Sequence, residues 1–322
     1  MSQVRTVLGD VPAAELGRTY MHEHLVIDSP LVADRMPHIH LASVDDAVAE
    51  AGACHAAGVG TMVDAMPCAS GRDVVRLAQI SRRSGVHIIA VTGLHTAKYY
   101  PGQPWAREAD VETLAALFRA DIEEGIDAWE YTGPVVTRTA HRAGMLKIAT
   151  AGPEPDAAER RLFEAAAAVA RATGAPVLTH CEQGEGGLEQ IELLRAAGLP
   201  LDRVVLSHTD KRADLGYHRE LLTAGVNLEY DQALRQATDE PRGTAWLLAT
   251  MLEEGFGDQL LLGTDGARRS LWRSLGGGPG LAWLASDYPA VLADRGVEAA
   301  AVRRLFVDNP ARVLALTPGD GR

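Results

Sequence analysis

The sequence predicts a single (β/α)8 barrel, the TIM-barrel architecture, over residues 1–322. Short runs rich in β-branched residues alternate with alanine-rich stretches of helical periodicity, and the connections between them are short. A chain of 322 residues has the size of one such barrel with long loops. No Pro/Ser/Gly-rich linker or block of like charge divides its middle, so we expect one domain.

Eight runs have strand character, and each is followed by a helical pattern. The expected strands cover residues 20–27, 60–64, 87–92, 145–149, 176–180, 203–208, 225–229 and 259–263. The expected helices lie near residues 43–57, 71–84, 107–124, 155–173, 185–198, 214–224, 241–255 and 294–307. This strict alternation is typical of a closed parallel barrel.

Two segments exceed a minimal barrel. Residues 96–107 follow the third strand, and residues 268–288, with a Gly-Gly-Gly-Pro-Gly stretch at 276–280, follow the eighth. Loops at the carboxyl ends of barrel strands carry the functional residues of this architecture. We therefore expect substrate loops after strands 3 and 8, and a further one after strand 7, where Arg235 lies.

Composition narrows the class of protein. The chain is 47% hydrophobic and 23% charged, with a formal net charge of −12, which argues against nucleic acid and anionic membranes as partners. The first residues show no basic and then apolar leader, and no apolar run reaches membrane-spanning length. The three cysteines, Cys54, Cys68 and Cys181, fit a reducing compartment. We expect a cytoplasmic protein that acts on a small molecule.

A histidine pair lies on the first expected strand, in Thr-Tyr-Met-His-Glu-His-Leu. On a strand, residues i and i+2 project to the same side with Cα atoms roughly 6.6 Å apart. His22 and His24 could therefore bind one metal ion together.

Four further residues end or interrupt later strands, and the barrel would bring them to the same end as the histidine pair. They are Lys147, His180, His208 and Asp265. Histidine and aspartate suit zinc or another borderline divalent ion. The remaining histidines show no such arrangement, although His95 lies in the loop after the third strand.

Lys147 is one of only three lysines against 28 arginines, and it interrupts an apolar strand. A buried, unpaired ammonium is costly. The residue must have a lowered pKa, pair with a nearby carboxylate, or react with carbon dioxide to give a carbamate that could bridge two cations.

The motifs Thr-x-x-His-Glu-His-Leu, Met-Leu-Lys-Ile-Ala-Thr, Thr-His-Cys-Glu-Gln-Gly, Ser-His-Thr-Asp and Gly-Thr-Asp occur in this order, with Asn-Pro-Ala-Arg near the C-terminus. The set resembles the phosphotriesterase-like branch of the amidohydrolase superfamily, essentially from end to end. The resemblance implies a binuclear metal-dependent hydrolase, a lactonase or phosphotriesterase, and suggests a homodimer.

The resemblance also implies roles for these positions. His22, His24 and Asp265 would hold the more buried metal, and His180 and His208 the more exposed one. A second implication concerns the bridge: N6-carboxylated Lys147 and a hydroxide would link two divalent ions, of which zinc is the first choice and manganese, cobalt or nickel the alternatives. As the catalytic residue, Asp265 would move the proton of the hydroxide to the leaving group.

The loops indicate the substrate. The stretch around Lys98, Tyr99 and Tyr100 resembles the strand-3 loop of lactone-hydrolysing members, in which an aromatic hydroxyl orients the lactone. Arg235, after strand 7, and Arg268 and Arg269, just beyond Asp265, could bind phosphate or carboxylate through the guanidinium fork. We expect hydrolysis of sugar lactones that carry an anionic group.

Other readings stay open at this point. An acyl-lactone hydrolase with phosphotriesterase side activity would need an apolar pocket, which four large residues could line: Leu271, Trp272, Leu281 and Trp283. An amide hydrolase would use the same hydroxide. A non-enzymatic metal-binding scaffold would be expected to have lost ligands, whereas this ligand set is intact.

Overall fold

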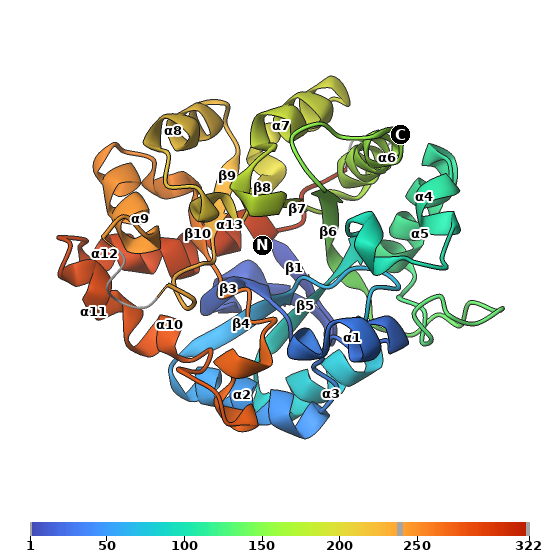
Figure 1. Ribbon diagram of the computed structural model, residues 1–322, viewed down its shortest axis with the longest axis horizontal. Coiled ribbons are helices and arrows are strands. Elements are labelled where there is room, and N and C mark those ends of the chain that lie inside the picture. Colours follow the sequence, from blue (N-terminus) through green and yellow to red (C-terminus); the bar gives the residue numbers. More distant parts are fainter. Residues whose placement is uncertain (1, 237–240, 320–322) are drawn as a thin grey trace.

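The computed structural model describes residues 2–236 and 241–319 and shows an eight-stranded parallel barrel ringed by helices (Figure 1). The strands follow one another around the barrel in chain order. They are β3 Arg18–Glu23, β4 Val59–Asp64, β5 His87–Gly93, β6 Ala143–Thr150, β7 Val177–Cys181, β8 Val204–Ser207, β9 Asn227–Tyr230 and β10 Leu260–Leu262. The first and last strands meet where Thr264 and Asp265 donate their backbone N–H groups to the carbonyl of His22. The predicted (β/α)8 fold class is confirmed.

The ring consists of helices, and most of the larger ones begin at a polar N-cap residue whose side chain accepts a backbone N–H of the first turn. The larger ones are α2 Val44–Ala56, α3 Val74–Ser84, α5 Val111–Glu123, α6 Ala157–Thr173, α7 Gly187–Ala196, α8 Leu215–Thr223 and α9 Thr244–Glu253. Shorter ones are α1 Pro30–Arg35, α4 Trp105–Glu108, α10 Trp283–Ser286, α11 Tyr288–Ala293, α12 Ala299–Arg303 and α13 Asn309–Leu314. Asp156 shows the capping at its fullest, because its carboxylate accepts from the first turn of α6 while Glu159 bonds back to it. Among the described residues, no helix combines the length and apolarity needed to cross a membrane.

An N-terminal hairpin was not expected from the sequence. It pairs β1 Gln3–Thr6 with β2 Gly9–Pro12 in antiparallel fashion. Val4 joins Leu16, Val313 and Leu314 in the apolar cluster that fills the barrel interior. The hairpin and the last helix thus close the amino-terminal end of the barrel. Two four-residue strands with few apolar residues carry too weak a periodicity to be recognised.

Two apolar layers hold the barrel together, one inside it and one between its strands and the helices. Along β6, Met145 belongs to the inner cluster, whereas Leu146 and Ile148 belong to the outer one. Because side chains alternate along a strand, Lys147 faces the interior, two residues beyond Met145. The strand register therefore places this lysine inside the carboxyl end of the barrel.

Several predicted boundaries differ from the structure. The first barrel strand ends at Glu23, so His24 lies in the loop, and the pairing with β4 shifts register between Tyr20 and Glu23. A bulge of this kind re-aims side chains. Strand β8 stops at Ser207, one residue before His208. The helix expected at 294–307 begins only at α12 and widens into a π-helical turn, Arg304–Asp308, before α13.

Candidate metal centre

Four histidine rings pack against one another at the carboxyl end of the barrel interior. The ring centroids of His22 and His24 lie 5.2 Å apart, those of His22 and His208 4.8 Å apart, and those of His180 and His208 4.6 Å apart. All four side chains are buried. The structure thus brings together histidines at the carboxyl ends of three separate strands, as a metal centre requires.

Asp265 completes this cluster from the loop after β10. Its Oδ1 lies 3.4 Å from Nε2 of His24, and the potential ligand atoms of His22, His24 and Asp265 lie within 4.8 Å of one another. The preceding Gly263 permits this approach, because a Cβ there would lie 2.8 Å from the backbone nitrogen of His22. Glycine is needed where two backbones come this close.

Two of these residues have a backbone conformation that only glycine adopts freely. His208 has φ 66° and Asp265 has φ 44°. Each is held by a hydrogen bond: His208 donates its N–H to Asp231 at 3.1 Å, and Asp265 donates its N–H to the carbonyl of His22 at 3.0 Å. Strained residues retained at the end of barrel strands are typical of functional sites.

Glu23, between the two histidines, fixes the loop that carries Asp265. Its carboxyl group accepts from the backbone N–H of Thr264 at 3.0 Å and from the Thr264 hydroxyl at 2.5 Å. Burial raises the pKa of Glu23 to about 8, although the hydrogen bonds from Thr264 oppose this shift. Glu23 therefore supports the site from the side facing the helices.

Lys147 is fully enclosed, with 1% of its surface exposed. Among the described residues, its Nζ has no hydrogen-bond partner and no carboxylate within ion-pair distance. Burial lowers the pKa of Lys147 to about 8, although the nearby Glu229 and Asp265 act in the opposite direction. Of the alternatives left open by the sequence, the direct ion pair is not formed here.

Two acidic residues at the end of β9 were missed by sequence reasoning. Asp231 Oδ2 lies 2.6 Å from Nδ1 of His208, and Glu229 Oε2 lies 3.4 Å from Nδ1 of His22. Burial, followed by the neighbouring Asp231, raises the pKa of Glu229 well above its usual range. The signal was present in Glu-Tyr-Asp: like the histidine pair, these carboxylates are two residues apart where a strand ends.

The residues present fit a divalent metal centre. Burial, followed by Lys147 and His208, lowers the pKa of His22 well below its usual range, and burial with His208 lowers the pKa of His180 to about 3. Neutral imidazole is the form that binds a metal. The buried Nδ1 of His24, like Nζ of Lys147, has no hydrogen-bond partner within the described ranges.

The three residues predicted to bind substrate in the loop after the third barrel strand, β5, lie in different environments. Lys98 is exposed and pairs with Glu182 at 3.2 Å, and that same carboxylate lies 3.1 Å from Nε2 of His180. Tyr99 packs beside the centre, and burial, followed by Asp265, raises its pKa to about 12. Tyr100 is buried, and its hydroxyl is already engaged in two hydrogen bonds to the protein.

The three arginines predicted to bind the anionic group of the substrate also differ in their contacts. Arg235 lies 2.7 Å from Oδ2 of Asp265 and donates to its carbonyl as well. Burial would raise the pKa of Asp265, but Arg235 and His24 hold it well below its usual range. Arg269 is exposed and donates to the carbonyl of His40 at 2.9 Å. Arg268 is exposed, and its guanidinium group has no polar partner in the part of the chain that the structure describes.

The apolar residues considered for an acyl-lactone pocket lie mainly in the core. Trp272 is 1% exposed and donates its indole N–H to the carbonyl of Gly266 at 2.7 Å, and Leu281 is fully buried. Leu271 is also buried, whereas Trp283 is partly exposed. These side chains support the loop after β10 rather than line an open apolar pocket.

Comparison with known proteins places this chain in a family. The model of the phosphotriesterase family matches residues 2–314. The chain is 31% identical to a phospho-furanose lactonase of Mycoplasmopsis synoviae, over 97% of this chain and 91% of the relative.

Solved structures agree with that match. An amidohydrolase from Mycoplasma synoviae superposes with a TM-score of 0.92 at 29% identity, covering 99% of this chain and 93% of that one. A lactonase from Listeria monocytogenes superposes with a TM-score of 0.89 at 26% identity, covering 98% and 100%. This chain belongs to the phosphotriesterase family of metal-dependent hydrolases.

Proposed function

We propose that this hydrolase opens sugar lactones that carry a phosphate or another anionic group, using two divalent metal ions. The observation that carries the proposal is the convergence of one ligand set at one end of the barrel, next to Arg235 and to the exposed Lys98–Glu182 ion pair. That set comprises His22, His24, Lys147, His180, His208 and Asp265. The phospho-furanose lactonase and the lactonase among its relatives support the substrate class.

The family resemblance and the donor set together assign the ligands. His22, His24 and Asp265 would hold one ion, and His180 and His208 the other. Zinc is the first choice for imidazole and carboxylate ligands, and manganese, cobalt and nickel accept the same donors.

Lys147 would bridge the two ions after carboxylation. Its neutral Nζ attacks carbon dioxide: a nitrogen–carbon bond forms, the displaced electron pair leaves a carboxylate, and one proton is lost from the nitrogen. The lowered pKa of Lys147, about 8, supports this chemistry because only the neutral amine is nucleophilic. The absence of an ion pair at Nζ, among the described residues, supports it as well.

When bound, two divalent ions supply a hydroxide from water near neutral pH and polarise the lactone carbonyl. Asp265 would accept the proton of this hydroxide while the oxygen of the hydroxide forms a bond to the lactone carbonyl carbon. The carboxyl group then delivers that proton to the ring oxygen as the ring carbon–oxygen bond breaks, which leaves a hydroxy acid. Arg235 keeps Asp265 ionised and so ready to accept the proton.

The exposed cations in the loops after β5 and β10 would bind the anionic group of the substrate. The guanidinium group of Arg268 has no polar partner within the described residues, so its fork is available for bidentate binding. Arg269 keeps donors besides the one given to His40, and Lys98 would exchange its exposed ion pair with Glu182 for the substrate. Arg235 would contribute only the part of its fork that Asp265 does not use.

The test combines metal content with matched substrates. Protein purified without chelators should contain divalent metal and open five-membered sugar lactones with a phosphate faster than the same lactones without one. Arg268→Gln should lower kcat/KM for the phosphorylated lactone by roughly 10-fold or more, as expected for a charged hydrogen bond, and leave the neutral one nearly unchanged. Arg303→Gln, on an outer helix, is the matched control. An equal effect of Arg268→Gln on both substrates would reject the anionic-group assignment.

A further inference from the structure

His95 is a further histidine at the metal centre, outside the six-residue ligand set. It lies in the loop after β5, and its ring centroid is 4.7 Å from that of His180 and 4.3 Å from that of Tyr99. The side chain therefore lies beside the half of the centre that contains His180.

The hydrogen bonds of His95 fix its tautomer. The backbone N–H of Thr96 donates to Nδ1 at 2.7 Å, and the Thr96 hydroxyl lies 3.1 Å from the same atom. A backbone N–H can only donate, so Nδ1 is the acceptor and the ring proton is on Nε2. Nε2 is at the far end of the ring from the backbone, and it has no hydrogen-bond partner among the described residues. The ring thus offers one N–H donor.

The backbone of His95 is also held in place. Tyr100 accepts the N–H of His95 at 2.8 Å and donates its hydroxyl proton to the carbonyl of Cys68 at 3.1 Å. This buried tyrosine therefore links the loop after β5 to the loop after β4. The Cys68 thiol in turn donates to Asp121 at 3.4 Å and lies 3.3 Å from the Thr92 hydroxyl.

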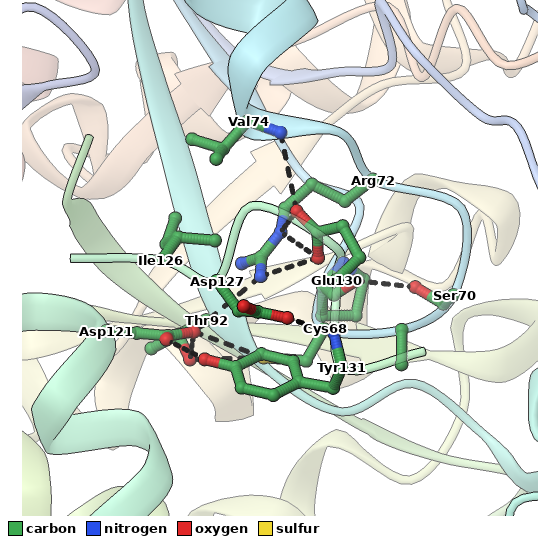
Figure 2. Close-up of polar contacts among 12 residues, drawn as sticks. Cys68, Ser70, Arg72, Val74, Thr92, Asp121, Ile126, Asp127, Glu130 and Tyr131 are labelled. Carbon is green, nitrogen blue, oxygen red and sulfur yellow. Dashed lines mark hydrogen bonds and ion pairs between the residues drawn. The ribbon is translucent and has the colours of Figure 1, made fainter. Parts of the chain in front are cut away.

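A buried ionic network anchors the loop after β4 (Figure 2). The Arg72 guanidinium pairs with Glu130 at 2.8 Å, lies 3.6 Å from Asp121, and donates to the carbonyl of Val91. The Tyr131 hydroxyl donates to Asp121 from the side of the cluster that Figure 2 shows in front. Because these buried groups satisfy one another, the loop beneath Tyr100 is fixed. Thr96 and Tyr100 together hold the imidazole in one orientation.

We propose that His95 is a specificity-determining residue that donates its Nε2 proton in a hydrogen bond to an oxygen of the bound lactone, beside the His180 side of the centre. Tyr100 is the positioning residue that holds it there. The proposal rests on the proposed lactonase function and names a residue of that same site. His95 is not a metal ligand in this assignment, because a ligand nitrogen must be unprotonated and the Thr96 hydrogen bonds leave the proton on Nε2.

The kinetic test uses two variants of His95 in the metal-loaded, full-length protein. His95→Phe keeps a ring but removes the donor, and should lower kcat/KM for the lactone that the wild type opens best by roughly 10-fold or more. His95→Gln retains an amide N–H at a similar distance from the backbone and should restore part of that loss. Both variants should keep the wild-type metal content. Wild-type kcat/KM in His95→Phe, or loss of metal from both variants, would overturn the proposal.

A measurement without turnover separates this proposal from the lactonase function. The ring-nitrogen NMR shifts of zinc-loaded protein should show His95 protonated at Nε2, and Tyr100→Phe should weaken kcat/KM less than His95→Phe does. A His95 protonated at Nδ1 would overturn the donor assignment even in an active lactonase. A wild type with the expected tautomer but no activity on any lactone would reject the proposed function, and the substrate role of His95 with it.

Discussion

The two ends of the barrel interior are built by the same strands from opposite kinds of side chain. At the amino-terminal end, Val4, Leu178 and Val205 pack in an apolar cluster that the N-terminal hairpin closes. At the carboxyl end lie His180, two residues beyond Leu178, and the loop residue His208, three residues beyond Val205. One end is close-packed, whereas the other contains buried polar atoms without partners among the described residues.

This difference separates stability from chemistry within a few ångströms. Along β6, Met145 contributes to the apolar cluster, and Lys147 lies on the same face about 6.6 Å away. The apolar layer fixes the strands in register, and the polar layer uses that rigidity to hold ligand groups in place. A buried lysine without a partner destabilises a barrel unless a ligand or a modification compensates for it.

The largest effect should come from making the polar carboxyl end of the barrel interior resemble its apolar amino-terminal end. Lys147→Met replaces the buried amine by an apolar side chain of similar length. We expect it to lose metal and to reduce turnover by more than the roughly 10²–10⁴-fold of a general acid–base group alone. The metal-free variant should melt at the same or a higher temperature than the metal-free wild type, since the unpaired amine is gone. Metal analysis, kinetics and calorimetry check the three outcomes.

Lys147→Ala should lose metal and activity, and should regain part of both when a short carboxylic acid is added. No loss on that substitution would reject the carbamate bridge.

Asp265→Asn removes the charge of one residue at the carboxyl end of the barrel interior and leaves the shape of its side chain nearly unchanged. Turnover should fall by roughly 10²–10⁴-fold, because the amide cannot accept the proton. Much of the metal should remain, since the histidines are unchanged. Steady-state kinetics with metal analysis provide the check, and wild-type turnover in this variant would remove Asp265 from the proton-transfer step.

The pH dependence of stability tests the buried amine at the carboxyl end of the barrel interior without any substrate. In the metal-free folded protein Lys147 loses its proton near pH 8, whereas in the unfolded chain it keeps it up to about 10.5. The unfolded state binds more protons between these values, so the free energy of unfolding should rise with pH across this window. Denaturant titrations at pH 8 and above measure the slope. Lys147→Met should have a smaller slope, and identical slopes would show that the amine is not buried in its neutral form.

The smallest effect on turnover should come from a substitution at the apolar, amino-terminal end of the barrel interior. Met145→Ala removes a core side chain and should lower the free energy of unfolding by about 2–5 kcal/mol while leaving kcat near the wild-type value. Chemical denaturation and kinetics on the same preparation test both parts. A large fall in kcat with little loss of stability would mean that the layers are not separate in function.

Much of the fold and part of the site could be predicted from the pattern of strands in the sequence. The barrel was predicted because eight apolar runs alternate with helical patterns, and parallel strands must then bring their carboxyl ends together. Their ends carried His22, His180 and Asp265, so the convergence followed from topology.

What the sequence did not reveal depends on local geometry. The bulge near Tyr20 and the left-handed backbone of His208 leave no periodic signal, because each involves a single residue. Glu229 and Asp231 were overlooked because two carboxylates near a strand end are common in solvent-exposed turns. The engagement of the Tyr100 hydroxyl depends on Cys68, a partner 32 residues away that only the folded chain brings near.

The most direct test of the account is the metal content of the wild type and of Lys147→Met, both purified without chelators and in the presence of bicarbonate. We expect about two divalent ions per wild-type chain, as in other two-metal hydrolase sites, and far fewer in the variant. A wild type that takes up no metal even after zinc or manganese is added, or a variant that keeps both ions, would contradict the account.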